Sequence, residues 1–182
     1  RAVIEEKDVD FTIYEVPLVL AEQGLDDLVL EHLRLETRRR DLKGWRRMIS
    51  TIRNIKDEVE IAVVGKYIAL HDAYKSIYEA LTHGGIANRV RIRLRKVAAE
   101  DVESAGAAKL LSGSHGVLVP GGFGERGIEG KISAIRWARE NRIPFFGICL
   151  GMQTAVIEFA RHAAGLKGAN STEFQKTTPH PV

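Results

Sequence analysis

The chain has 182 residues with ordinary globular composition, 45% hydrophobic and 28% charged, which is enough for one well-buried domain and part of another. Its net charge of +3 is too small to indicate a nucleic-acid partner, and no stretch is apolar enough to span a bilayer. One cysteine excludes a disulfide framework and a multi-cysteine metal site, and a free thiol suits a reducing cytoplasm.

The pattern of residues 1–34 predicts secondary structure, but this segment has too few apolar side chains to form a core of its own. We expect a strand within residues 9–16, a short helix over 18–23 between a proline and a glycine, and a second amphipathic helix from Leu25. Because the chain starts at Arg1 without a methionine and enters this pattern at once, we expect it to be part of a longer protein, beginning in the end of a preceding domain.

Residues 35–58 are rich in charge and poor in candidate core residues. They include the basic run 38–40, which is typical of a solvated helix or linker face. The spacing of the few apolar residues fits one helix packed across a surface. We therefore interpret residues 35–58 as an interdomain linker.

From residue 59 onward, apolar strands alternate with helices. The expected strands are residues 61–65, 90–95, 116–119 and 144–148, and the expected helices are residues 72–85, 100–111, 128–141 and 149–163. Three strands are continuous apolar runs, typical of strands buried on both faces, whereas 90–95 alternates with arginines and predicts a strand near an edge. This order predicts an α/β fold with a parallel sheet flanked by helices.

A glycine-cysteine-glycine turn spans residues 147–151, between the last strand and the last helix. Glycines on both sides permit the strained backbone of a sharp turn that lifts Cys149 clear of the sheet. The N-terminus of the following helix favours a thiolate, and the N–H of Leu150 could stabilise an oxyanion. Open α/β sheets bind ligands at the carboxyl ends of their strands, so we interpret Cys149 as a nucleophile rather than a structural thiol.

A second glycine-rich turn, residues 120–127, follows another buried strand. Alone it is equally typical of a tight turn, but two such loops at strand ends support each other. A second oxyanion donor is then expected around Gly122 and Phe123. No Gly-Lys-Ser/Thr follows, so the loop is not a P-loop.

A thiolate that attacks an amide also needs a proton donor for the leaving ammonia, usually histidine. None of the six histidines has an acidic residue at a spacing that indicates a dyad. His115 precedes a strand at the wrong end of the sheet, His162 lies along the last helix, and His180 stands between two prolines. The sequence therefore offers a nucleophile and an oxyanion hole without an identifiable base.

Residues 120–124 and 147–153 together resemble the triad-type glutamine amidotransferases, and further segments narrow the resemblance to the CTP synthase family. These segments are residues 7–10, 23–27, 64–67, 72–76, 83–85, 118–124 and 170–174. The resemblance covers essentially the whole chain. It implies an incomplete flavodoxin-like class I glutamine amidotransferase core over residues 59–182, preceded by the tail of an amidoligase (synthetase) domain over residues 1–34.

The resemblance implies a C–N bond-forming ligase that aminates UTP to CTP with ATP, using ammonia released from glutamine. ATP and Mg²⁺ would act in the amidoligase domain, whose Mg²⁺ ligands are outside this chain, and GTP would activate glutamine hydrolysis. The implied enzyme is a cytoplasmic homotetramer. Its implied partners are the small molecules glutamine, UTP, ATP and GTP, with no nucleic acid and no membrane.

Matching motif positions carry the family's residue roles onto this chain. Cys149 would form a glutamyl thioester. Glutamine would be held by Gly122, Leu150, Gly151, Met152, Gln153 and Glu173, the last of which could bind the substrate's amino group. Asp8, Val9 and Asp10 would bind ATP, with Val9 against adenine. Lys66, Tyr67, Lys75 and Arg126 would lie near the domain interface through which GTP acts.

The departures from the family limit what this piece should do. Most of the amidoligase domain is missing, and the family's catalytic His and Glu are expected beyond Val182, so we expect the piece alone to be inactive. Three alternatives remain open: the glutaminase part of a GMP or carbamoyl-phosphate enzyme, a non-catalytic regulatory module, and another cysteine hydrolase. The resemblance of residues 7–27 argues against the first.

Overall fold

The computed structural model describes residues 3–36 and 40–182, so the first two arginines of the basic run 38–40 lie outside the described part. The chain divides into two compact units, Arg1–Ile55 and Lys56–Val182. The assignment of residues 1–34, 35–58 and 59–182 to domains and a linker stays a prediction.

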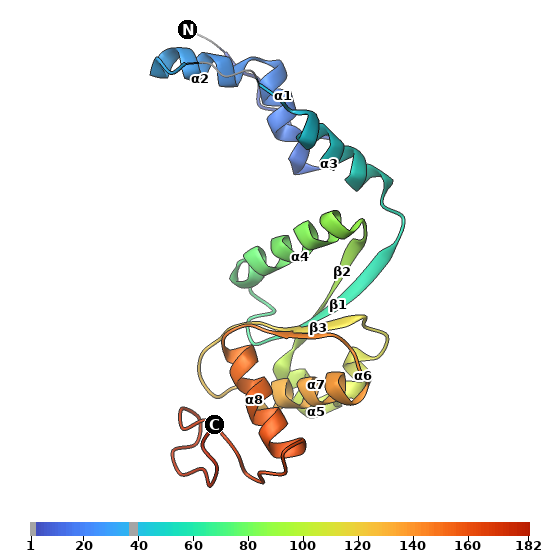
Figure 1. The fold of residues 1–182 in the computed structure, drawn as a ribbon, viewed down its shortest axis with the longest axis vertical. Helices are drawn as coiled ribbons and strands as arrows, with labels where there is room; N and C mark the ends of the chain where they lie inside the picture. Colours follow the sequence, from blue (N-terminus) through green and yellow to red (C-terminus); the bar gives the residue numbers. More distant parts are fainter. Residues whose placement is uncertain (1–2, 37–39) are drawn as a thin grey trace. The chain divides into compact units, whose positions relative to one another are not determined.

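The first unit is helical in its described residues (Figure 1). Its elements are η1 (Ile13–Glu15), α1 (Val16–Glu22), α2 (Leu25–Leu33) and α3 (Lys43–Asn54). The strand expected within residues 9–16 is wrong. The Thr12 side chain caps η1 by accepting from the Tyr14 N–H, Pro17 lies in the first turn of α1, and no described strand of this unit offers the pairing that a strand needs.

The second unit is built on a four-stranded parallel sheet with the order β2-β1-β3-β4. Its strands are β1 (Glu58–Gly65), β2 (Arg91–Ala98), β3 (Gly116–Val119) and β4 (Phe145–Gly147). The arginine-alternating strand β2 lies at an edge of this sheet, as expected. The prediction of a parallel α/β fold is therefore confirmed.

Helices cover both faces of the sheet (Figure 1). They are α4 (Lys75–Asn88) on one face and α5 (Ala99–Ala105), α6 (Ala107–Leu111), α7 (Ile128–Glu140) and α8 (Leu150–His162) on the other. Alternate strand residues divide between two cores, because successive side chains of a strand point to opposite faces. Val64 and Val119 join the core that includes Ile135 of α7, whereas Val63 and Leu118 pack with residues of α4.

Two helix predictions need correction. The helix expected to end at Gly84 and Gly85 continues to Asn88, because Gly85 is buried where β2 crosses closely and Arg89 ends the helix with a φ of 58°. It is also preceded by a separate 3-10 turn, η2 (His71–Tyr74). The helix expected over residues 100–111 divides into α5 and α6 at Gly106, whose φ of 87° no helix accommodates.

The strand expected to be buried on both faces at residues 144–148 is also only partly right. β4 lies at the end of the described strand order, and the side chain of Phe146 is 64% exposed. It borders an apolar hollow of about 270 Å³ that Ile77 and Leu118 also line. The side chains of α4 that line this hollow leave Phe146 exposed, so the apolar sequence of β4 does not produce a buried strand.

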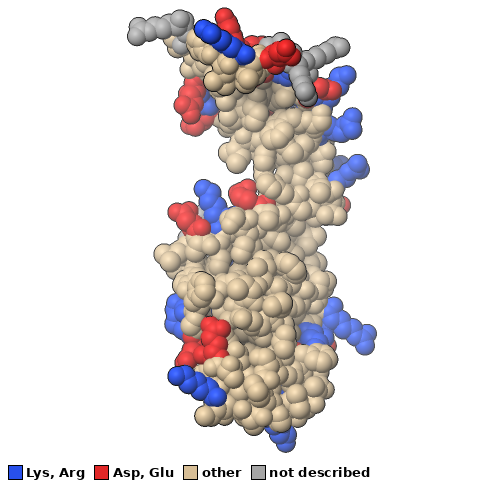
Figure 2. Space-filling view, turned by 60° about the vertical axis from the view of Figure 1, so that its left-hand side comes forward, with Lys and Arg blue, Asp and Glu red and all other residues tan. Residues whose placement is uncertain are grey.

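None of the helices in the described ranges is long and apolar enough to cross a bilayer. On the face drawn in Figure 2, single basic and acidic groups interrupt broad areas of uncharged surface. Arg40, the described member of the basic run, pairs with Asp26 at 2.7 Å.

Candidate functional site

Three loops meet at the carboxyl edge of the parallel sheet. They follow β1 at Gly65, β3 at Val119 and β4 at Gly147. β3 and β4 are neighbours, and the N–H of Ile148 donates to the carbonyl of Val119 at 3.0 Å. Carboxyl ends of parallel strands are the usual ligand-binding edge of such a sheet.

The turn after β4 holds Cys149 in an uncommon backbone conformation. Its φ is 53° and its ψ is −108°, and it is the N-cap of α8. Its carbonyl accepts from the N–H groups of Met152 at 3.0 Å and Gln153 at 3.1 Å, so the helix itself holds the turn. A non-glycine residue at positive φ is often found at a functional site, where the surroundings enforce the strain. The thiol is exposed.

The two glycines beside this cysteine are required by close packing. A Cβ on Gly151 would lie 2.0 Å from the carbonyl oxygen of Val119, and a Cβ on Gly147 would lie 2.6 Å from the Gly151 carbonyl group. Real Cβ atoms do not approach backbone this closely. The structure thus supports the sharp turn that the glycine spacing predicted.

The second glycine loop lies directly against the cysteine turn. A Cβ on Gly121 would be 3.6 Å from the Cβ of Cys149, and one on Gly122 would be 3.4 Å from the Leu150 side chain. Leu150 is buried and is the first residue of α8, where an N–H has no intrahelical acceptor. The residues predicted to form an oxyanion hole are therefore neighbours, although the Phe123 side chain is 78% exposed.

The loop after β1 braces the glycine loop. Lys66 Nζ donates to the Phe123 carbonyl at 2.6 Å, and a Cβ on Gly124 would lie 3.4 Å from the same nitrogen. The Tyr74 hydroxyl accepts from the N–H groups of Lys66 and Tyr67 at 3.2 and 3.3 Å, and burial raises the pKa of Tyr74. Of the other residues expected near a domain interface, Arg126 pairs with Glu100 at 2.5 Å, and Lys75 is exposed at the start of α4.

Lys131 is a residue that our sequence analysis missed. Its side chain is fully buried, its Nζ has no hydrogen-bond partner among the described residues, and a Cβ on Gly122 would lie 3.8 Å from that nitrogen. Burial lowers the pKa of Lys131, and the nearby Lys66 charge lowers it further. A helical-wheel reading would have found it, because Lys131 shares the apolar face of Ile128 and Ile135 at helical spacing.

Glu173 lies on an exposed turn whose position is set by its neighbour. Phe174 packs against the cluster that contains Ile128 and Leu150, so this turn is anchored beside the start of α7 and the start of α8. The Glu173 N–H donates to the Ser171 hydroxyl at 3.2 Å. Met152 and Gln153, also predicted to hold glutamine, are exposed on the first turn of α8.

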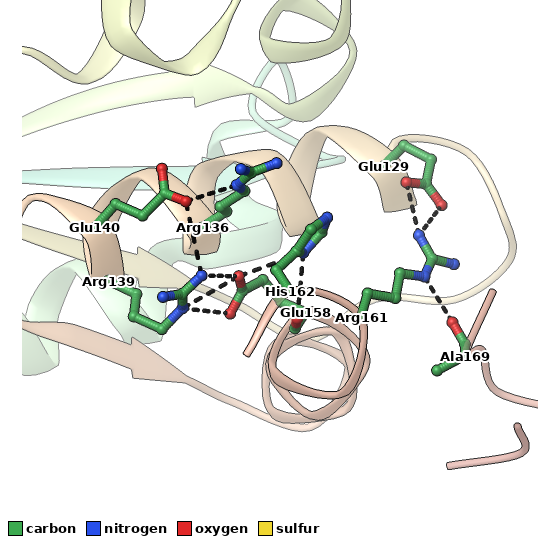
Figure 3. A network of polar contacts seen from close by, with 8 residues as sticks. All are labelled: Glu129, Arg136, Arg139, Glu140, Glu158, Arg161, His162 and Ala169. Carbon is green, nitrogen blue, oxygen red and sulfur yellow. Dashed lines mark hydrogen bonds and ion pairs between the residues drawn. The ribbon is translucent and has the colours of Figure 1, made fainter. Parts of the chain in front are cut away.

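The far ends of α7 and α8 are joined by a polar network (Figure 3). Glu158 is 1% exposed and accepts from Arg139 Nη2 at 2.8 Å, which raises the pKa of Arg139. His162 Nδ1 lies 3.4 Å from the same carboxylate, in the last turn of a 13-residue helix. That places it roughly 20 Å along α8 from Cys149. His115 Nδ1 accepts from the Glu60 N–H at the opposite end of the sheet, so neither histidine reaches the cysteine turn.

The residues predicted to bind ATP belong to the first unit. Val9 is half-buried and lines a hollow of about 330 Å³ together with Lys7, Val16 and other residues. Its sequence neighbours Asp8 and Asp10 are exposed. The proposed adenine contact therefore borders a cavity, and its role stays a prediction.

The fold and this site define a class of protein that comparison with known proteins supports. The family model of class-I glutamine amidotransferases matches residues 69–180. The chain belongs to the class-I glutamine amidotransferase family.

Relatives along the whole chain are more specific. It is 56% identical to the CTP synthases of Caldanaerobacter subterraneus and Desulfitobacterium hafniense and 54% identical to that of Geobacillus kaustophilus, each over all 182 residues. The chain spans about a third (34%) of the length of these curated relatives. Because the aligned residues include the first unit, which the amidotransferase model does not match, the relationship favours the CTP synthases over other glutaminases.

A solved structure is also similar. It is the glutaminase domain of a Trypanosoma brucei CTP synthase with bound acivicin, with a TM-score of 0.64 and 46% sequence identity. The match covers 68% of this chain and 48% of that one.

Proposed function

We propose that this chain is the ammonia-producing part of a CTP synthase. The observation that carries the proposal is the exposed thiol of Cys149 at positive φ, at the N-terminus of α8, with the Gly121 backbone against its Cβ. The family membership and the whole-length similarity to CTP synthases support the same reading.

In the proposed reaction, the Cys149 sulfur attacks the side-chain amide carbon of glutamine. Negative charge develops on the amide oxygen, where the N–H groups of Leu150 and of the Gly122–Phe123 peptide can stabilise it. The C–N bond then breaks, ammonia leaves with an added proton, and a glutamyl thioester remains. Water hydrolyses the thioester to glutamate and restores the thiol.

The leaving ammonia also needs a proton donor, and neither His115 nor His162 can supply it. His115 and His162 are engaged at other places in the fold. We assign the base to a histidine oriented by a glutamate outside these residues, as the family resemblance implies.

The remaining functions belong to the full-length enzyme. We propose that it is a cytoplasmic ligase that uses this ammonia, ATP and Mg²⁺ to aminate UTP, with GTP as activator and a tetrameric assembly. Glu173, Met152 and Gln153 would hold the glutamine, and residues 8–10 would contact ATP. Support for these finer assignments comes from matching family positions.

Covalent labelling of the full-length protein tests the nucleophile. An electrophilic glutamine analogue such as acivicin is expected to modify Cys149, and excess glutamine is expected to slow the reaction. Cys149→Ala should abolish labelling. It should lower glutamine-dependent CTP formation at least about 10³-fold, because no other group replaces the nucleophile. It should leave ammonia-dependent CTP formation intact. Labelling at another residue, protected by glutamine, would refute the assignment.

A further inference from the structure

Arg161 makes two contacts that join separate parts of the candidate site (Figure 3). Its Nη1 lies 2.9 Å from both carboxylate oxygens of Glu129, and its Nε donates to the carbonyl of Ala169 at 2.6 Å. Its side chain is only 16% exposed and Ala169 is fully buried, so the contact with Ala169 is shielded from water, whereas the Glu129 side chain is 62% exposed. A guanidinium can serve two acceptors at once because its donors project in a rigid fork.

The first acceptor stands at the glycine loop. Glu129 lies in the first turn of α7, two residues after Gly127 ends the loop that carries Gly121 and Gly122. The same helix is held tightly from its other side, because the Gly130 N–H donates to Glu103 Oε1 at 3.0 Å. Arg161 thus binds the first turn of α7, the helix that follows the proposed oxyanion loop.

The second acceptor stands at the turn that carries Glu173. Ala169 is fully buried, and the next residue, Asn170, organises the turn: its Oδ1 accepts from the Ser171 N–H at 2.9 Å and its Nδ2 donates to Gln175 Oε1 at 3.1 Å. The peptide at Ala169 is therefore one attachment of the 170–175 turn to the body of the unit, and the packing of Phe174 is the other.

We propose that Arg161 is a positioning residue for glutamine binding, which fixes the 170–175 turn relative to α7 and its glycine loop. The inference rests on the proposed function and deepens it. Arg161 does not touch the substrate. It sets the distance between Glu173, which would hold the amino group, and the loop beside Cys149, where the amide would react. A turn that is no longer held in place must be ordered when glutamine binds, which weakens substrate binding.

Steady-state kinetics of glutamine hydrolysis in the full-length protein test this role. Arg161→Met keeps most of the side-chain length and removes both donors. We expect it to raise KM for glutamine between about 10- and 100-fold and to change kcat by less than about 5-fold. Arg161→Lys should recover only part of the loss, because one ammonium cannot reproduce the fork to two acceptors.

Two further variants separate the contacts. Glu129→Gln keeps the Ala169 hydrogen bond and weakens the ion pair, so its KM is expected to rise less than that of Arg161→Met. Arg136→Met is the matched control, because Arg136 pairs with Glu140 at 2.8 Å on the exposed surface of α7, away from the 170–175 turn. It should leave KM unchanged.

Modification of Cys149 by iodoacetamide reports the cysteine turn independently of glutamine binding. An unchanged iodoacetamide rate with a raised KM in Arg161→Met supports the proposal. An unchanged KM overturns it, as does a fall in kcat alone. If Arg161→Met loses iodoacetamide reactivity and solubility, Arg161→Lys and Glu129→Gln decide: equal KM values in both and in the wild type overturn the proposal. Failure of the wild-type protein to hydrolyse glutamine would instead refute the proposed function.

Discussion

Lys131 places an ionisable amine in a fully buried position. A buried ammonium without a partner is costly, and burial lowers its pKa below the ordinary 10.5. At low pH Lys131 is protonated in both the folded and the unfolded state, so the folded state bears the full free-energy cost of the buried charge. Between the lowered pKa and 10.5 the unfolded state holds more protons, so stability should rise with pH.

Replacement of this lysine by methionine tests that reasoning. Lys131→Met should raise the free energy of unfolding by about 1–3 kcal/mol at neutral pH and remove its rise toward pH 10. Denaturant unfolding followed by Trp137 fluorescence in a Trp45→Phe background reports this unit. Lys109→Met, at an exposed position of α6, is the control and should change stability by less than about 0.5 kcal/mol. A destabilised Lys131→Met protein would show that the amine makes a favourable contact.

Among the site residues, the sequence predicted the reactive group, but it did not predict the residues that hold the site in place. Cys149 and its glycines were predicted from their spacing, because only a sharp strand-to-helix turn needs that pattern. Arg161 and Phe174 carry no such local signal. Their roles depend on partners 32 and 24 positions away, at Glu129 and Leu150, which only the folded chain brings near.

At the scale of elements, α4 shows how tertiary contacts override a local stop signal. Two adjacent glycines predicted a helix end, yet the helix passes through both. Gly84 faces open space, whereas a Cβ on Gly85 would lie 2.7 Å from the Val90 carbonyl and from Ile92 Cγ1. The pair therefore contains one glycine required by packing and one that is not.

These glycines should respond oppositely to alanine. Gly84→Ala is expected to stabilise the unit by about 0.5–1 kcal/mol, because alanine favours a helix interior. Gly85→Ala is expected to destabilise it by about 1–3 kcal/mol through overpacking against β2. Denaturation midpoints of the two variants measure both effects. Changes of the same sign in the two proteins would contradict this account.

At the scale of the whole molecule, the two units differ in how much apolar surface they bury. Within the described residues of the first unit, Ala21 and Ile49 are the buried hydrophobic side chains. The second unit buries two clusters on opposite faces of its sheet and a third between α7 and α8. Burial of apolar side chains is the main source of stability, so the free energy of unfolding should be smaller for the first unit than for the second.

Hydrogen exchange of the 182-residue chain measures this difference. Amides of α1 and α3 are expected to exchange at least about 100-fold faster than those of the central strands β1 and β3. Amides of exposed loop residues, such as Lys176 and Thr177, provide the unprotected reference. Equal protection of both units would show that they unfold together.

Sequence patterns alone determined the α/β class, the parallel sheet, the edge position of β2 and the candidate nucleophile, because each depends on local periodicity or on a turn that one motif can specify. The three-dimensional fold decided the rest. It placed an irregular segment and then helix where a strand was expected within residues 9–16, exposed Phe146 on β4, and buried Lys131 beneath the glycine loop. These outcomes depend on which surfaces meet across long sequence separations, and no local pattern encodes that.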